Sequence, residues 1–235
     1  MSFIKDMISV FKKKELMFRE SYKEADEVYT FLFEIDKSLT WNAGQYGLLS
    51  ITHKSIKNGT KPFSIASAPS ENVVRITTRI SGEPSEFKQA LLELKPGMSI
   101  KMGGPVGAFY PTDSRPSLFI AGGIGITPFR SILKQLEVEG SNEQKGIQLL
   151  YMDSNNTHLY KDELDRITTN TSIRITYMES KDELQQEIDK FIAKHKDNGN
   201  YFIAGPKSMV DDVTNYVKNQ NIPKRNIKKD VFFGY

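Results

Sequence analysis

The spacing of hydrophobic and polar residues divides the chain into two regions with different expected structures. From about residue 15 to 112, short runs rich in β-branched and aromatic residues alternate with turn residues, and the clearest runs lie at 28–33, 47–51 and 73–78. Such runs are typical of strands in an antiparallel sheet or barrel. A helix is expected from Glu86 to Leu94, because Lys95-Pro96-Gly97 ends it.

Beyond Arg115-Pro116, apolar runs alternate with segments whose apolar residues recur every three or four positions. Strands are expected at 117–121, 147–152, 173–178, 201–204 and near 227–233. The expected helices contain Phe129 to Leu136, Asp162, Leu184 to Ile192, and Met209 to Val217. This alternation predicts a parallel, doubly wound sheet. We therefore expect a boundary at Asp113–Pro116, between a β-rich domain at 15–113 and an α/β domain at 114–235.

Composition narrows the function classes. The chain has 38% hydrophobic and 26% charged residues and a net charge of +3, which is typical of a globular protein and argues against a nucleic-acid partner. It has no cysteine and three scattered histidines, so no disulfide, cysteine-ligated cluster or metal site is expected. Any redox chemistry then needs an organic cofactor. No apolar run is long enough to span a bilayer and no signal peptide is visible, so we expect a cytoplasmic protein.

A glycine-rich turn follows the first strand of the α/β region, in the segment Ala121-Gly-Gly-Ile-Gly-Ile-Thr-Pro-Phe129. Glycines let the backbone approach a phosphate, and the amides at the start of the next helix attract an anion. A bare glycine pair would indicate only a tight turn. Three glycines in four positions, followed by Thr-Pro, favour a nucleotide site. Its candidate residues are Gly122, Gly123, Gly125, Thr127 and Pro128.

A second strand ends in a similar turn, Ala204-Gly-Pro-Lys-Ser-Met209. Alone it would be an ordinary strand-to-helix turn. Ligands of open α/β sheets bind at the carboxyl edge of the strands, where both turns are expected. We therefore add Gly205, Pro206 and Met209 to the nucleotide site.

The β-rich region contains a cation and an aromatic ring two residues apart, in Lys61-Pro-Phe-Ser64. On a strand, Lys61 and Phe63 share one face and Ser64 points to the other. A flavin nucleotide would use such a cation and ring. These residues alone fit a solvated lysine beside a core phenylalanine better.

Taken together, these motifs resemble those of the ferredoxin–NADP reductase superfamily of FAD-binding reductases, over about Phe18 to Tyr235. Four further segments match in order, at 41–46, 82–87, 95–97 and 104–109. The resemblance implies a six-stranded antiparallel flavin-binding barrel followed by a five-stranded parallel nicotinamide-binding domain.

The resemblance also implies residue roles. Lys61 would pair with the flavin pyrophosphate, Phe63 would stack on the isoalloxazine, and Ser64 would lie near flavin N5. The remaining flavin contacts would come from Pro62, Thr77, Thr78, Pro84 and Ser85. The sequence departs from the family pattern in having lysine for arginine at 61, phenylalanine for tyrosine at 63 and alanine for cysteine at 204.

The carboxyl-terminal segment is similar to family tails in which an acid and an aromatic ring cover the flavin. Asp230 and Phe232 fit this pattern, with Asp230 and Ser64 as the catalytic candidates, and Tyr235 is the alternative covering ring. A buried, aromatic-rich final strand explains the segment equally well.

The implied reaction is hydride transfer from NAD(P)H to bound FAD, in preference to FMN, with electrons passing to a separate iron–sulfur, haem or membrane redox protein. Asp153 and the scarcity of cations near it favour NADH. Two alternatives remain open, a reductase of free flavin and a nucleotide-binding subunit of a larger complex. Residues 1–14 have amphipathic spacing, which fits a terminal helix or a weak membrane-surface contact.

Overall fold

The computed structural model describes residues 12–36, 38–57, 59–140, 146–153, 155 and 157–233. The chain forms two compact units, Met1–Ala108 and Phe109–Tyr235. Phe109 precedes the expected boundary at Asp113–Pro116, yet its ring packs in the second unit, with its centroid 5.4 Å from those of both Phe129 and Phe202. These aromatic contacts bind the start of the second unit to its own core.

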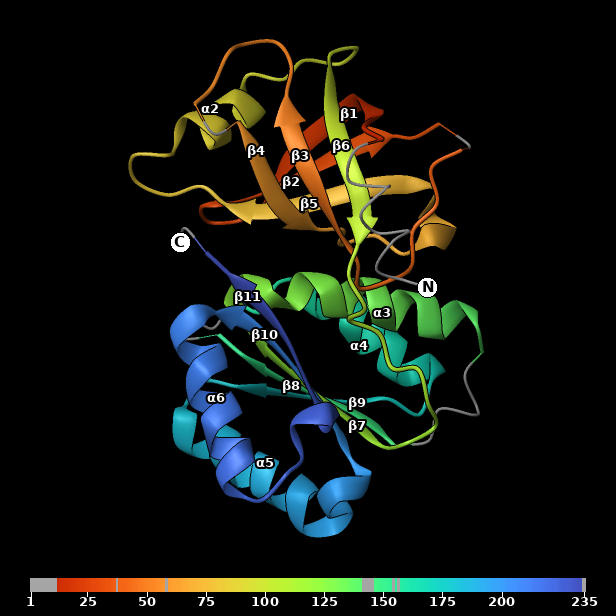
Figure 1. Cartoon of the computed structure of the whole chain (residues 1–235), viewed down its shortest axis with the longest axis vertical. Helices are drawn as coiled ribbons and strands as arrows, with labels where there is room; N and C mark the ends of the chain where they lie inside the picture. Colours follow the sequence, from red (N-terminus) through yellow and green to blue (C-terminus); the bar gives the residue numbers. More distant parts are fainter. Residues whose placement is uncertain are drawn as a thin grey trace. The chain divides into compact units, whose positions relative to one another are not determined.

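Six strands form one sheet in the first unit (Figure 1). They are β1 (Lys14–Ala25), β2 (Val28–Glu34), β3 (Tyr46–Ile51), β4 (Thr60–Ser64), β5 (Val73–Arg79) and β6 (Ser99–Val106). Their order is β4-β3-β6-β1-β2-β5, and each neighbouring pair is antiparallel. Just after β4, the Ala66 amide donates to the Arg75 carbonyl of β5 at 2.9 Å, which links the two edges of the sheet. The expected six-stranded antiparallel arrangement is confirmed.

The core of the first unit comes from alternate residues of facing strands. Phe31 pairs with Ile76 and Phe33 with Val74 across β2 and β5, and all four side chains are buried. The single α-helix described in this unit, α2 (Glu86–Leu92), buries Phe87, Ala90 and Leu91. Because β4 lies at the edge of the sheet, its residues keep partial exposure, which matters for the site below.

The second unit contains five parallel strands and four helices (Figure 1). The strands are β7 (Ser117–Gly122), β8 (Ile147–Met152), β9 (Arg174–Met178), β10 (Asn200–Pro206) and β11 (Ile227–Phe232), in the order β11-β10-β7-β8-β9. The helices are α3 (Ile126–Val138), α4 (Lys161–Asn170), α5 (Lys181–His195) and α6 (Lys207–Asn219). The expected parallel α/β domain is confirmed.

Alternating side chains on the central strand explain why helices cover both faces of this sheet. Leu118 and Ile120 of β7 pack in one cluster with residues of α5 and α6. Phe119, between them, stacks on Phe129 of α3, with the ring centroids 5.0 Å apart. From β7 the chain winds through β8 to β9 and then crosses to β10, on the other side of β7. The carboxyl ends of β7 and β10 therefore meet where the strand order reverses, the place where open α/β sheets bind ligands.

None of the helices in the described part of the chain has the length and apolar character that crossing a bilayer requires.

Candidate functional site

Two glycines shape the turn after β7, one because of its backbone conformation and the other because there is no room for a side chain. Gly123 has φ +50°, in the left-handed region, and a Cβ there would meet no atom within 4 Å. Gly125 has ordinary helical angles, but a Cβ would lie 2.3 Å from the Ala204 carbonyl oxygen. The turn is thus open beside Gly123 and closed beside Gly125.

The two predicted turns pack directly against each other. A Cβ on Gly122 would lie 2.2 Å from the sulfur of Met209, and one on Gly205 would lie 3.1 Å from the same sulfur. A Cβ on Gly205 would also lie 3.2 Å from the Gly122 carbonyl oxygen. The structure therefore brings these turns together at one edge of the sheet. Thr127 and Pro128 are buried in the first turn of α3, and the Thr127 hydroxyl donates to the Ile124 carbonyl at 3.0 Å.

The helices that follow these turns differ from the other two helices of the unit at their first turn. α3 and α6 have no side-chain cap and no acidic residue in the first turn. α4 begins with Asp162 and Glu163, and α5 begins with Asp182 and Glu183 after the Ser180 cap. A helix start carries a partial positive charge, which nearby acids neutralise. The starts of α3 and α6 therefore remain available to an external anion.

Asp153 follows β8 and is only 5% exposed. Its Oδ1 accepts a hydrogen bond from the Asn155 amide at 3.0 Å. The same segment is fixed by the Tyr151 hydroxyl, which accepts from the Leu159 amide at 3.0 Å. Burial, with the nearby Asp153 charge, holds the pKa of Tyr151 well above its usual value, so this hydroxyl stays neutral.

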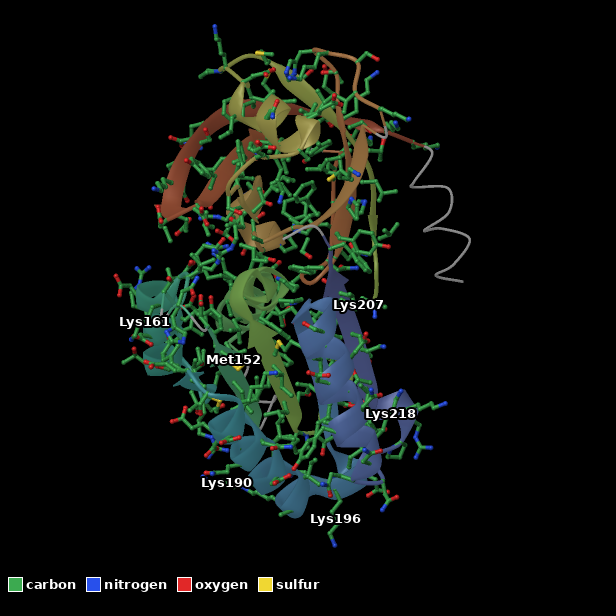
Figure 2. All side chains as sticks on the ribbon, turned by 90° about the vertical axis from the view of Figure 1, so that its left-hand side faces the viewer. Met152, Lys161, Lys190, Lys196, Lys207 and Lys218 are labelled. Atoms are coloured by element: carbon green, nitrogen blue, oxygen red, sulfur yellow. The ribbon has the colours of Figure 1, made fainter. Side chains whose placement is uncertain are left out.

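A cavity of about 220 Å³ lies between α5 and α6, beside Met209. Its lining is mainly apolar, and includes Met152, Leu184, Ile188, Met209 and Val213. Of the side chains labelled in Figure 2, Met152 is partly buried, whereas Lys161, Lys190 and Lys207 are exposed on the helices. Sequence reasoning missed this cavity, because the same apolar spacing predicts only a packed core.

The predicted flavin residues of β4 lie on an edge strand. Lys61 and Pro62 are exposed, and Phe63 and Ser64 are partly buried. The Phe63 ring stacks on Phe87 of α2, with centroids 5.6 Å apart and an angle of 23° between the planes. A second flat ring could therefore stack only on the opposite face of Phe63.

Thr77 and Thr78 lie on β5, at the other edge of the same sheet, and both are buried. The Thr30 hydroxyl donates to the Glu24 carboxylate at 2.8 Å and lies 2.7 Å from the Thr77 hydroxyl. Because Thr30 has only one hydroxyl proton, Thr77 must donate to Thr30.

The predicted turn at Pro84 and Ser85 leads into α2. The Ser85 hydroxyl caps this helix by accepting from the Lys88 amide at 3.4 Å. Burial and the positive charge of Arg79 lower the pKa of Lys88. Lys88 thus lies beside this turn, and the sequence reasoning missed it, since it belongs to no motif.

The carboxyl-terminal candidates lie on β11, next to the second glycine turn. Asp230 pairs in register with Ala204 and Phe232 with Pro206, and both side chains are partly buried. Tyr235 lies outside the described residues. No group of acidic or histidine side chains in the described part of the chain is arranged to hold a metal ion.

Comparison with known proteins gives a family match for the second unit. Residues 119–215 match the model of the oxidoreductase NAD-binding domain. The chain is 26% identical over 206 residues to the toluate 1,2-dioxygenase electron transfer component of Pseudomonas putida, covering 83% of this chain and 59% of that protein. It spans 36% to 65% of the length of such curated relatives.

Two solved structures share the fold of the whole chain. One is ferredoxin-NADP+ reductase from Plasmodium falciparum, with a TM-score of 0.79 and 20% identity, covering 95% of this chain and 97% of that one. The other is a ferredoxin NADP+ reductase from Neisseria gonorrhoeae with bound FAD and NADP, with a TM-score of 0.77 and 18% identity, covering 94% and 99% of the two chains. At identities of 20% and 18%, the likeness to these two structures shows the fold alone.

Proposed function

We propose that this chain, a member of the ferredoxin–NADP reductase superfamily, is an NAD(P)H-dependent flavoprotein oxidoreductase. It would pass its electrons to a separate protein. One observation carries this proposal. The two glycine turns interlock at the switch point of the sheet, and the helices that follow them have no acid in their first turns. That arrangement suits the pyrophosphate of a dinucleotide.

The nucleotide would be held mainly by backbone. The phosphates would lie at the open side of Gly123, near the positive end of α3, with Gly122, Gly125, Thr127 and Pro128 shaping the turn. Gly205, Pro206 and Met209 would hold the nicotinamide end. Asp153 would contact the adenosine ribose, and for this reason we propose NADH as the preferred hydride donor. Because Asp153 is buried, the ribose would have to approach it closely.

The residues of the first unit fit a flavin in their chemistry. On an edge strand, Lys61 offers a charge and Phe63 offers a partly buried ring that stacks on Phe87. Pro62, Thr77, Thr78, Pro84 and Ser85 would line the same ligand, and Ser64 would orient the reactive part of the ring. Bound FAD would supply the hydride acceptor and the one-electron chemistry. The chain's own task is to position both rings and exclude water.

The carboxyl-terminal strand supplies the remaining proposed roles. Asp230 would hold a proton near the flavin, and Phe232 or Tyr235 would cover the ring. The sequence has no cysteine, so the ligands of a cysteine-ligated cluster would lie outside these 235 residues. The Pseudomonas putida relative is named as an electron transfer component of a dioxygenase. By analogy we propose an iron–sulfur or haem protein as the acceptor. The cytoplasmic location and the membrane contact of residues 1–14 stay predictions.

An anaerobic titration of the purified protein with NADH and NADPH tests the proposal. We expect bound flavin to lose its visible absorbance with one nucleotide or both. Failure of both to bleach the flavin would overturn the proposed activity. Flavin that leaves the protein on reduction would point instead to a reductase of free flavin.

The role of Ser64 is tested separately. Ser64→Ala should slow flavin reduction while the flavin stays bound, because it removes only a hydroxyl. Ser70→Ala, at an exposed position outside the strands of this unit, is the control and should reduce normally. Equal rates in the two variants would contradict the role of Ser64.

A further inference from the structure

An ion pair between two residues that have no role assigned above joins α3 to α4. Arg130 of α3 has 2% of its side chain exposed, and Glu163 of α4 has 18%. The guanidinium donates twice to the carboxylate, from Nε to Oε2 and from Nη2 to Oε1, each at 2.8 Å. Such a two-point contact fixes orientation as well as distance.

The same guanidinium also contacts the residue that precedes α4. Its Cζ lies 5.2 Å from the centre of the Tyr160 ring, a cation–π distance. Tyr160 has φ +63°, a left-handed conformation that a tyrosine adopts only when its surroundings impose it. Arg130 therefore holds both the first turn of α4 and the end of the segment leading into it.

That segment joins Asp153 to Tyr160, and its described residues also make hydrogen bonds to β8 and β9. The Asp153 amide donates to the Met178 carbonyl at 3.2 Å, and the Leu159 amide donates to the Tyr151 hydroxyl. Arg130 adds the link to α3, and it lies one turn beyond Thr127 on that helix. The pair thus connects the glycine turn to the segment that carries Asp153.

We propose that Arg130 and Glu163 are positioning residues that set the spacing between the phosphate-binding turn and the adenosine-binding segment of the nucleotide site. This inference rests on the proposed function. A buried ion pair is weak support for stability, because apolar side chains of similar volume often stabilise as well, but its directional bonds specify one arrangement. The adenosine half of the dinucleotide should therefore depend on the pair more than the nicotinamide half does.

Calorimetric titration of the flavin-loaded protein with ADP-ribose and with nicotinamide mononucleotide tests this. Glu163→Gln should weaken ADP-ribose binding about tenfold and leave mononucleotide binding within about twofold. The rate of flavin reduction at saturating NADH should also stay within about twofold. Arg130→Lys keeps the positive charge but loses the planar guanidinium that donates two hydrogen bonds. It should weaken ADP-ribose binding less than Glu163→Gln does. Glu187→Gln, on the surface of α5 and paired with Lys190, is the matched control and should bind normally.

A double variant, Arg130→Met with Glu163→Leu, separates positioning from folding. It leaves no unpaired buried charge, so it should fold with a thermal midpoint close to that of the parent protein. We expect it still to bind ADP-ribose about tenfold more weakly. A folded double variant with parental ADP-ribose affinity would overturn the inference, as would equal weakening of both ligands. If the parent protein itself bleaches with neither nucleotide, the proposed function fails, and this inference fails with it.

Discussion

The glycine-turn region of the second unit and the β4–α2 region of the first are built in opposite ways. Around Gly122, Gly125 and Gly205, backbone and the Met209 sulfur fill the space that any side chain would need. On β4, the candidate groups are the side chains of Lys61 and Phe63, on a partly exposed edge strand. A site made of backbone tolerates few substitutions, whereas a site made of side chains can be adjusted residue by residue. The departures from the family pattern at 61 and 63 fall in the second kind of site.

Gly125→Ala gives the largest expected effect and tests whether backbone atoms exclude a side chain at the glycine turn. The new Cβ would lie 2.3 Å from the Ala204 oxygen and 2.7 Å from the Gly205 Cα, and both are backbone atoms of a central strand. We expect a loss of about 3 kcal/mol in the free energy of unfolding, or a protein that does not accumulate. Urea denaturation measures the loss, and ADP-ribose binding should disappear with it.

Two other glycines test whether the cause is steric. Gly123→Ala meets open space but a positive φ, so it should cost only about 1 kcal/mol. Gly122→Ala would meet the flexible Met209, and Met209→Ala in the same chain should recover part of the stability. Equal losses in all three single variants would show that the backbone argument is wrong.

Phe63→Leu tests the side-chain site. Leucine keeps apolar volume against the core but has no flat face for stacking. We expect flavin affinity to fall about fivefold, since stacking contributes about 1 kcal/mol beyond burial. Phe63→Tyr keeps the face and should bind flavin as the parent protein does. Release of flavin fluorescence on dilution measures both, and an unchanged affinity in the leucine variant would remove Phe63 from the site.

The fold of the second unit follows closely from its sequence pattern, and that of the first only in part. The five parallel strands and four helices match apolar periods that each element carries by itself. β1 gives no such signal, because its twelve residues bury only Leu16 and Phe18. Its place inside the sheet comes from hydrogen bonds to β2, which follows it directly, and to β6, which lies far along the chain. The pairing with β6 is not visible in any local pattern.

In the candidate site, too, the features that local sequence patterns predict are separated from those that depend on distant residues. Glycine turns are local, so the sequence could predict them and their meeting at one edge. Arg130 sits beside Phe129 in a helix and would ordinarily be expected in solvent. Its burial depends on Glu163, 33 residues away. No local pattern reports such a pair, and the same holds for the effect of Arg79 on the pKa of Lys88.

Ser208→Asp tests whether the positive end of α6 contributes to nucleotide binding. Ser208 is exposed in the first turn of α6, where no acid is present. An aspartate there should stabilise the helix by about 0.5 kcal/mol, and should weaken ADP-ribose binding about threefold by occupying the positive helix end with a negative charge. Glu183→Gln at the start of α5 should instead lose a similar stability without affecting binding. A binding loss that does not shrink as salt is added would contradict an electrostatic cause.

An effect of similar size but opposite sign, a gain in affinity, is expected from Lys61→Arg. Lysine offers a point charge, whereas arginine offers a planar fork that binds two phosphate oxygens together. Lys61 is exposed on the edge strand, so a longer side chain meets no packed core and the fold should tolerate it. We expect flavin to bind about threefold more tightly, with Lys61→Met weaker than the parent protein. Lys54→Arg, which pairs with Glu93 elsewhere on the unit, controls for a general effect of arginine. Equal flavin affinity in the arginine and methionine variants would mean that residue 61 does not contact the phosphates, and the side-chain site would then rest on Phe63 alone.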